Sequence, residues 1–265
     1  MDSEKDFKPS SGSLYSPGFP VFIIVVLLIA LCLIFARNVR AQDGDLPPVI
    51  MWSVAKVEAQ RTLPPVFENG QRVLPVKTNH GTAFAVDVTN YKRPQFRYVL
   101  TNAHVVFDPV IKDGKLTGYV ESETIRLVSP KVNAKAKVLA VDHDEDLCLL
   151  LADADFPAKL ALADELPREG DKVLLMGGPG PAYAGPYDGY FVSGAVNGGD
   201  RCQIAVQFFH GCSGGPFLRG VRVFAVAVGG VPDGKGELIP GVATAIPLTT
   251  VRGFLEKALK VKRGD

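Results

Sequence analysis

The stretch Gly211-Cys-Ser-Gly-Gly-Pro216 decides how this sequence is read. A serine nucleophile needs an exposed hydroxyl and nearby backbone N–H groups that converge on a developing oxyanion. Gly211 allows a tight backbone conformation that aims such groups at one point, while Gly214 and Gly215 leave room for a substrate and for the incoming strand. We therefore predict Ser213 as a nucleophile. A glycine-rich stretch of this kind also occurs as a mere turn, so the prediction depends on partners elsewhere in the chain.

A candidate general base lies in Leu100-Thr-Asn-Ala-His-Val-Val106. His104 follows a predicted strand that ends in a Thr-Asn turn, and it sits beside the small residue Ala103. A general base needs a defined position of this kind. Taken alone, His104 would be better explained as a core histidine whose hydrogen bonds are satisfied.

A cluster of acids in Asp142-His-Asp-Glu-Asp-Leu-Cys-Leu-Leu150 supplies the third candidate. Asp146 immediately precedes an apolar strand, so we expect it to be drawn inward, where its carboxylate could orient an imidazole. Asp142 and Asp144 are predicted to be turn residues. His143 and these acids do not have a recognised metal-ligand spacing, so we predict no metal site.

The rest of the chain after residue 50 consists of short apolar runs broken by turn signals. This pattern is typical of an antiparallel barrel or sandwich. The C-terminus differs, because its apolar residues repeat at helical spacing, which predicts a packed terminal helix. The predicted strands are 82–86, 96–100, 124–128, 137–141, 147–151, 172–176, 203–207 and 223–228, and the helical apolar residues are Val251, Phe254, Leu255 and Leu259.

The N-terminus contains one long apolar segment. Residues 1–17 are polar and predict a disordered tail. Residues 19–36 carry no charge, and a helix over them would be ~27 Å long, enough to cross a bilayer core. We therefore predict a transmembrane anchor over residues 18–37, followed by a linker at 38–50 and one domain over 51–265.

A cleaved signal peptide is the alternative for this segment. Val39-Arg40-Ala41 resembles a small-x-small cleavage site. The segment has two basic residues on each side, Lys5 and Lys8 before it and Arg37 and Arg40 after it, so charge gives no orientation.

Composition narrows the function classes. The net charge of the 265 residues is only +1, which gives no reason to expect nucleic acid as a partner. One of the four cysteines, Cys32, lies in the apolar segment. The odd number that is left, Cys148, Cys202 and Cys212, does not suggest a disulfide framework. A Cys202–Cys212 bridge stays open.

The three candidates follow the chain order His, Asp, Ser, as in the chymotrypsin class; subtilisins and α/β-hydrolases have other orders. Over roughly residues 75–257 the sequence resembles trypsin-fold serine proteases, in particular the HtrA/Deg type. The segments that carry this resemblance are 81–86, 98–106, 146–150, 169–179, 192–197 and 241–247. The resemblance implies two antiparallel β-barrels with His104, Asp146 and Ser213 as a catalytic triad in the cleft between them.

The resemblance also implies a function. The chain would be a serine endopeptidase acting on polypeptides through an acyl-enzyme, with the N–H groups of Gly211 and Ser213 as its oxyanion hole and no cofactor. We expect a single-pass membrane protein with an extracytoplasmic protease domain, acting in protein quality control or processing. It would be secreted or periplasmic if the segment is cleaved. The alternative is a trypsin-fold binding or chaperone protein without activity. The oligomeric state stays open.

The sequence departs from the family pattern at two places. We expect no PDZ module after the terminal helix. Cys212 stands before the serine, where trypsins carry an aspartate and HtrA types an asparagine. A cysteine makes no strong ion pair with a newly cut N-terminus, so we expect no trypsin-like zymogen activation.

The resemblance further places a pocket for the substrate residue before the cut. Counting back six residues from Ser213 puts Gln207 near its floor, with Phe208, Phe209 and His210 along one wall. The opposite wall would come from Ala227, Val228 and Gly229. Because neither stretch contains an acid, we predict small to medium uncharged side chains rather than Lys or Arg. Two alternatives remain: strand alternation turns one phenylalanine into the core, or His210 at the rim favours an acidic residue.

Overall fold

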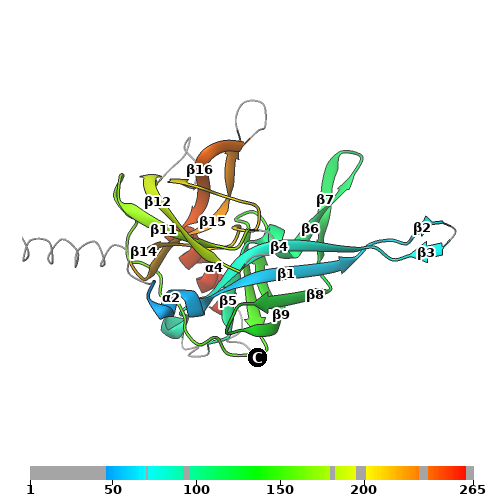
Figure 1. The fold of residues 1–265 in the computed structure, drawn as a ribbon, viewed down its shortest axis with the longest axis horizontal. Helices are drawn as coiled ribbons and strands as arrows, with labels where there is room; N and C mark the ends of the chain where they lie inside the picture. Colours follow the sequence, from blue (N-terminus) through cyan, green and yellow to red (C-terminus); the bar gives the residue numbers. More distant parts are fainter. Residues whose placement is uncertain are drawn as a thin grey trace, which may run out of the picture. The chain divides into compact units, whose positions relative to one another are not determined.

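Two closed antiparallel β-barrels and a C-terminal helix make up the fold of this computed structural model (Figure 1). The structure describes residues 46–69, 71–91, 96–179, 183–194, 201–232 and 238–260. The predicted tail, anchor and most of the linker lie outside these residues. Within them, no helix is long and apolar enough to span a bilayer.

The first barrel closes in the strand order β1-β4-β5-β10-β9-β8. Its interior is filled mainly by alanine and valine, which suits a tightly closed six-stranded barrel. The strands are β1 (Val54–Thr62), β4 (Val76–Ala85), β5 (Tyr98–Thr101), β8 (Thr124–Val128), β9 (Asn133–Asp142) and β10 (Leu147–Ala152).

The second barrel closes in the order β11-β12-β13-β16-β15-β14. Its core holds larger side chains, including Phe191, Phe217 and Phe224. The strands are β11 (Lys172–Gly177), β12 (Gly185–Ser193), β13 (Cys202–Val206), β14 (Pro216–Arg219), β15 (Arg222–Pro232) and β16 (Leu238–Pro247). Every predicted strand overlaps an observed one, because the apolar runs are the barrel interiors.

The helices lie before, between and after the strands, and the last of them contacts both barrels. The helices are α2 (Pro48–Ser53), the 3₁₀ turn η1 (Thr89–Tyr91), α3 (Ala103–Val106) and α4 (Leu248–Lys260). In α4 the residues Val251, Phe254, Leu255 and Leu259 are all buried, which confirms the predicted helical face. Helix α2 spans the predicted boundary between linker and domain.

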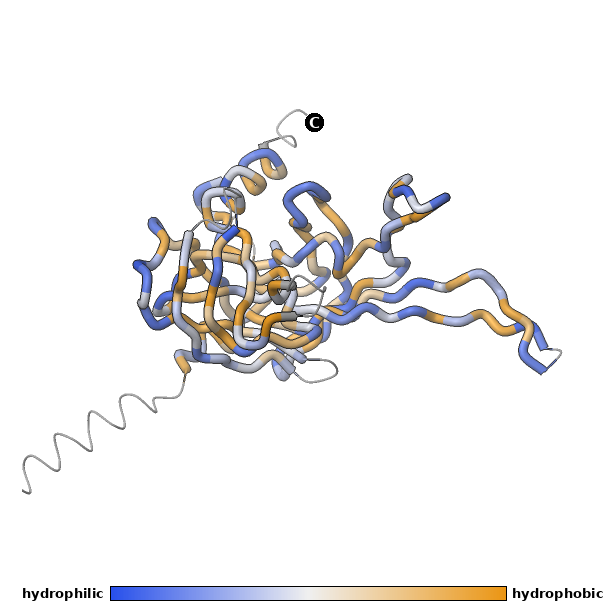
Figure 2. The backbone as a smooth tube through the Cα atoms, turned by 90° about the horizontal axis from the view of Figure 1, so that it is seen from above, coloured by the Kyte–Doolittle hydropathy of each residue, from blue (hydrophilic) through white to orange (hydrophobic). Residues whose placement is uncertain are grey.

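Two hairpins, both outside the predicted strands, extend away from the barrels. One prolongs β1 and β4 and ends in β2 (Val66–Glu68) and β3 (Gln71–Val73); the other pairs β6 (Phe107–Lys112) with β7 (Lys115–Glu121). In the tube view of Figure 2 both hairpins run away from the barrels. Phe67, near the tip of the first hairpin, is 77% exposed.

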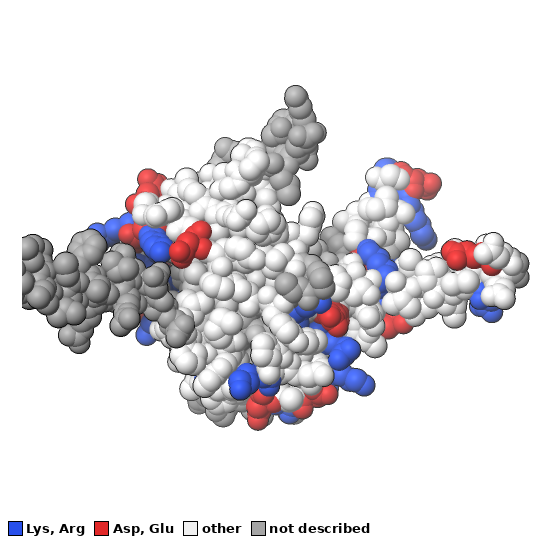
Figure 3. Space-filling model, in the orientation of Figure 1, with Lys and Arg blue, Asp and Glu red and all other residues white. Residues whose placement is uncertain are grey.

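Charged side chains are interspersed over the surface. In the view of Figure 3, Lys/Arg and Asp/Glu lie together along the lower edge and on the two hairpins, and much of the central surface is uncharged. This face therefore shows no patch of a single sign of the kind that nucleic-acid binding requires.

Candidate active site

His104 and Asp146 meet at the edge of the first barrel. His104 lies in the one-turn helix α3 after β5, and Asp146 lies in the turn between β9 and β10. The His104 ring nitrogen Nδ1 is 2.8 Å from Asp146 Oδ2, and the His104 backbone N–H donates to Oδ1 at 2.9 Å. Because a carboxylate only accepts, Nδ1 carries the proton and Nε2 is left as an acceptor.

Asp146 has a left-handed backbone with φ 58°, which Asp tolerates better than most residues. Two groups hold its carbonyl oxygen: the Asn102 side-chain Nδ2 donates to it at 2.9 Å and the Ala103 N–H at 3.2 Å. These bonds keep the unusual turn in place and present the carboxylate to His104. Asn102 belongs to the Thr-Asn turn of the sequence, but no local pattern there predicts this role of its side chain.

Ser213 lies in the turn between β13 and β14, where glycines allow the backbone to follow a tight path. Gly211 has φ 99° and Gly214 has φ 83°, values that L side chains rarely adopt. A Cβ on Gly214 would collide with the carbonyl oxygen of Thr82 and the hydroxyl of Thr101. The glycines thus let this loop pack directly against β4 and β5 of the first barrel.

The Ser213 hydroxyl donates to the carbonyl oxygen of Val228 at 2.7 Å. Within the described part of the chain, no hydrogen bond joins Ser213 to His104. A hydroxyl has a single proton to donate, so Ser213 must release Val228 before it can donate to the imidazole. Catalytic hydrogen bonds are often looser in free enzymes than in complexes.

One pocket is lined by both His104 and Ser213. A cavity of about 320 Å³ is lined by Thr78, Asn79, His80, His104, Val105, His210, Gly211 and Ser213. It therefore joins the end of the first barrel to the loop that carries the serine. Three of the four histidines of the chain face it.

Two backbone N–H groups at the serine loop are left without a hydrogen-bond acceptor in the part of the chain that the structure describes. Neither the N–H of Gly211 nor that of Ser213 has an acceptor among the described residues. Their carbonyl oxygens, in contrast, are both engaged by Thr82, through its hydroxyl to Gly211 at 2.7 Å and through its N–H to Ser213 at 2.8 Å. The two N–H groups are thus available to an oxyanion.

The residues predicted for the specificity pocket come from two stretches of the chain, and residues 227–229 form the first. Val228 contacts Ser213 directly, and the carbonyl oxygen of Gly229 accepts from the Thr244 hydroxyl at 3.2 Å. Ala227 is buried and accepts from the Gly214 N–H at 2.8 Å. These three residues lie on one strand beside the nucleophile.

The opposite stretch, residues 207–210, follows the end of β13 and lies outside any strand, and only one of its phenylalanines packs inward. Phe208 packs against the second core, whereas Phe209 is 39% exposed, with its ring centroid 5.7 Å from that of Tyr187. Gln207 and His210 are both exposed, and His210 lines the Ser213 cavity.

Cys212 is buried inside the second barrel. A Cβ on Gly177 would lie 2.6 Å from its Sγ, so the thiol fills the space that this glycine leaves. Burial raises the pKa of the Cys212 thiol. Cys148, Cys202 and Cys212 are all free, so Cys202 and Cys212 are not bridged.

His143 packs as an aromatic residue. Its ring stacks on Tyr119 at 3.7 Å between centroids and meets Phe107 edge-on at 4.9 Å. Among the described residues no group of three or more His, Cys, Asp or Glu side chains is arranged to hold a metal.

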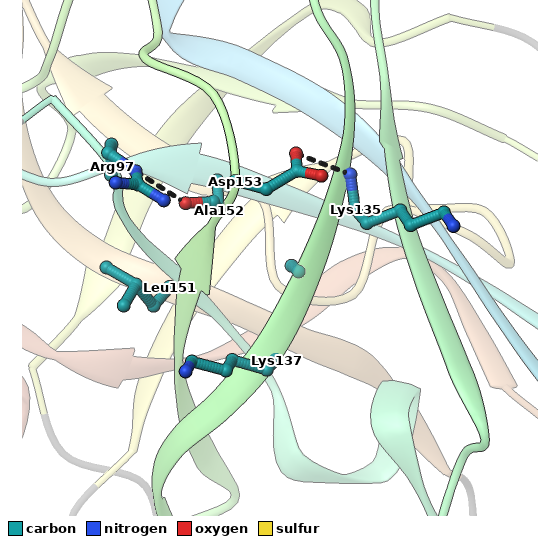
Figure 4. Close-up of a pocket in the computed structure, with 7 residues that line it drawn as sticks. Arg97, Lys135, Lys137, Leu151, Ala152 and Asp153 are labelled. Atoms are coloured by element: carbon teal, nitrogen blue, oxygen red, sulfur yellow. Dashed lines mark hydrogen bonds between the residues drawn. The ribbon is translucent and has the colours of Figure 1, made fainter.

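A second cavity of about 310 Å³ lies on the outside of the first barrel (Figure 4). Arg97 Nε donates to the Ala152 carbonyl at 2.7 Å, and the Lys135 N–H donates to Asp153 Oδ1 at 2.9 Å. Lys137 and Leu151 also line this cavity. This cavity is lined by no serine, cysteine or histidine, so the candidate site is the one at Ser213.

Comparisons with known proteins agree with this geometry. A model of the trypsin-like peptidase domain matches residues 81–228, more than half of the chain. The Rv3671c protease from M. tuberculosis in its active form is 20% identical, with 80% of this chain and 82% of that chain covered and a TM-score of 0.58. Its inactive form is also 20% identical, over 80% and 91% of the two chains, with a TM-score of 0.55.

The serine endoprotease from Yersinia pestis is 20% identical, over 80% of this chain and 65% of that one, with a TM-score of 0.58. At this identity the likeness to solved structures establishes the fold. No curated protein sequence matches the chain. The two barrels and the cavity lined by His104 and Ser213 agree with the family match. The chain therefore belongs to the trypsin-like peptidase domain family, as that match shows.

Proposed function

We propose that this protein is a serine endopeptidase whose catalytic triad is His104, Asp146 and Ser213. A peptidase domain implies polypeptide substrates. The observation that carries the proposal is the pairing of His104 with Asp146 at 2.8 Å on the wall of the cavity that also exposes Ser213. A neutral imidazole whose Nδ1 proton is held by a carboxylate is the form that can accept a proton at Nε2.

In the proposed reaction Ser213 Oγ attacks the peptide carbonyl carbon while its proton moves to His104 Nε2. The carbonyl oxygen becomes an oxyanion between the N–H groups of Gly211 and Ser213. The C–N bond then breaks as the leaving amine takes the proton from Nε2, which leaves an acyl-enzyme. Water attacks the ester in the same way, and Ser213 departs with its proton restored. Asp146 stabilises the imidazolium in both halves.

One observation favours a second candidate, a binding or chaperone protein without activity. The Ser213 hydroxyl is bonded to Val228 rather than to His104. If that arrangement persists with substrate bound, the imidazole has no proton to take.

A fluorophosphonate probe and a casein assay separate the two candidates. We expect the wild-type protein to be labelled at Ser213 and to cleave casein. Ser213→Ala should lose both properties, with a rate loss of about 10⁴-fold or more. Cys212→Ser, a change in the adjacent residue that keeps a small side chain against Gly177, should retain most activity. Absence of labelling and cleavage in the wild-type protein would support the binding protein.

We further propose that residues 18–37 anchor the protein in a membrane, with the protease domain outside the cytoplasm and acting in protein quality control or processing. The uncharged run of residues 19–36 supports anchoring. Resistance to carbonate extraction and shielding of the domain from protease added to the cytoplasmic side are the expected results. A soluble form that starts near Gln42 would contradict the anchor and favour signal cleavage.

A further inference from the structure

Thr82 lies where both barrels and the serine loop meet. It belongs to β4 of the first barrel and is fully buried. Its neighbours include Gly178, directly after β11 of the second barrel, and the segment from Gly211 to Ser213. Thr82 is thus the residue through which one barrel touches the backbone that would bind the oxyanion.

The two partners of the Thr82 hydroxyl determine which hydrogen bond it donates and which it accepts. Oγ1 is 2.7 Å from the carbonyl oxygen of Gly211, which only accepts, and 2.9 Å from the N–H of Gly178, which only donates. The hydroxyl therefore gives its proton to Gly211 and accepts from Gly178. All three groups are buried, so water cannot readily replace a missing partner.

The main chain of Thr82 completes the contact. Its N–H donates to the carbonyl oxygen of Ser213 at 2.8 Å, and its own carbonyl oxygen accepts from the Thr101 hydroxyl at 2.8 Å. One residue thus holds both ends of the segment Gly211–Ser213, its side chain at the first residue and its backbone at the last. The Cys212 N–H, bonded to the Phe209 carbonyl at 3.1 Å, holds the middle.

We propose that Thr82 is a positioning residue for the oxyanion hole, an inference that rests on the proposed peptidase function. Gly211 is conformationally permissive, and its φ of 99° is one of several values that a glycine can adopt. The bond from the Thr82 hydroxyl fixes the peptide that joins Gly211 to Cys212, which lies between the two peptides that carry the Gly211 and Ser213 N–H groups. Fixing this middle peptide restricts the backbone rotations at Gly211 and Cys212, and it thereby limits the directions that the two N–H groups can take. The side-chain hydroxyl is therefore needed for transition-state binding, beyond any part it plays in stability.

Substitutions at Thr82 separate these roles. Thr82→Ser keeps the hydroxyl, whereas Thr82→Val keeps the shape and Thr82→Ala keeps neither shape nor hydroxyl. Direct loss of an oxyanion donor costs about 10²–10³ in kcat, so an indirect loss should be smaller, about 10–100-fold for Val and Ala. KM should change by less than about threefold, because the oxyanion forms only in the transition state. The Ser variant should stay within about threefold of wild type.

A peptide aldehyde supplies a readout that a merely structural role would not move. Its adduct with the serine places an oxyanion in the hole, so its affinity should fall by the same factor as kcat in Thr82→Val. The matched control is Ser53→Ala, which removes another buried hydroxyl, bonded to the Val49 carbonyl at 2.6 Å. This control should lower the unfolding midpoint without changing kcat or aldehyde affinity.

The outcomes distinguish this inference from the proposed function. If the wild-type protein cleaves peptides and Thr82→Val or Thr82→Ala does so at a rate within about threefold of it, the positioning role is refuted and the peptidase function stands. If Thr82→Val fails to fold, the Ser and Ala variants, which differ by one oxygen atom, decide the question. If the wild-type protein and Ser213→Ala are equally inactive, the peptidase function is wrong, and the inference fails with it.

Discussion

His104 donates to the carboxylate of Asp146 twice, from ring Nδ1 to Oδ2 at 2.8 Å and from the backbone N–H to Oδ1 at 2.9 Å. The two carboxylate oxygens of Asp146 thus accept from different groups of His104. Oδ1 ties Asp146 to the start of helix α3, while Oδ2 orients the imidazole and sets its tautomer. This separation allows the structural and the electrostatic part of the carboxylate to be tested independently.

Asp146→Asn should lower kcat by about 10⁴-fold while the protein stays folded. Asparagine tolerates the left-handed backbone at this position, and its oxygen can still accept from the His104 N–H. Its NH₂ group then faces Nδ1 and favours the wrong tautomer. The control is Asp142→Asn at the end of β9, directly before the same turn, where the carboxylate accepts from the Glu145 N–H at 3.1 Å. Steady-state kinetics on a peptide ester would disprove the role if Asp146→Asn kept more than about a tenth of kcat.

Substrates with an uncharged aliphatic residue before the cut should be preferred. Val228 and Gly229 lie beside Ser213, and neither this stretch nor residues 207–210 contains an acid. A buried Lys or Arg side chain without a partner would cost several kcal/mol. Matched peptides with Val, Ala, Arg or Glu at this position measure the preference as kcat/KM. Cleavage after Arg ten times faster than after Val would refute the pocket, since ~1.4 kcal/mol in that direction is more than a neutral pocket supplies.

Asp108 should stabilise the fold at neutral pH and lose this effect in acid. Burial alone would raise the pKa of Asp108, but hydrogen bonds from Lys77 and Asn79 and the charges of Lys77 and Arg61 outweigh it, and the pKa is lowered. The folded pKa therefore lies below the unfolded value of about 3.9. The stabilisation is present above the unfolded value and is lost as the pH falls through the folded pKa.

Urea unfolding of Asp108→Asn measures this effect. At pH 7 the free energy of unfolding should be about 1–2 kcal/mol below wild type, a modest value because solvent screens the half-exposed Lys77. The difference should shrink toward zero in acid, as the pH falls through the lowered pKa of Asp108 in the folded protein. Asp188→Asn is the control, because its pair with Lys172 at 3.1 Å is well exposed and should contribute little. An equal deficit at pH 7 and in acid would contradict the ionic origin.

The thiols Cys148, Cys202 and Cys212 should resist alkylation in the folded protein. All three are fully buried, and burial raises the pKa of Cys202 to about 11 and that of Cys148 still higher. Reaction needs both access and the thiolate form. Peptide mapping after iodoacetamide treatment at pH 8 should find all three unmodified, and modified after unfolding in guanidinium. Rapid labelling of Cys212 in the folded state would mean that the serine loop opens.

The sequence could predict those residues of the site whose neighbours along the chain form a recognisable pattern. Ser213 is surrounded by glycines, His104 follows a strand and a turn, and Asp146 directly precedes a strand. Each pattern reflects a local need, for a permissive backbone or a sharp turn, so each leaves a trace in neighbouring residues. Asn102 and Thr82 both lie within segments that resemble the family, but neither has neighbours in sequence whose pattern indicates its role.

The sequence by itself predicted eight of the twelve barrel strands, the amphipathic face of α4 and the three candidate catalytic residues. Apolar periodicity and turn chemistry are properties of adjacent residues. Only the tertiary structure placed the Thr82 hydroxyl against Gly178 and Gly211, which are 96 and 129 residues away along the chain. It alone directed the Ser213 proton to Val228 and extended the two hairpins from the first barrel. Closure of the barrels makes these contacts, because hydrogen bonds between distant backbone groups depend on where strands meet in space, a relation that no local pattern encodes.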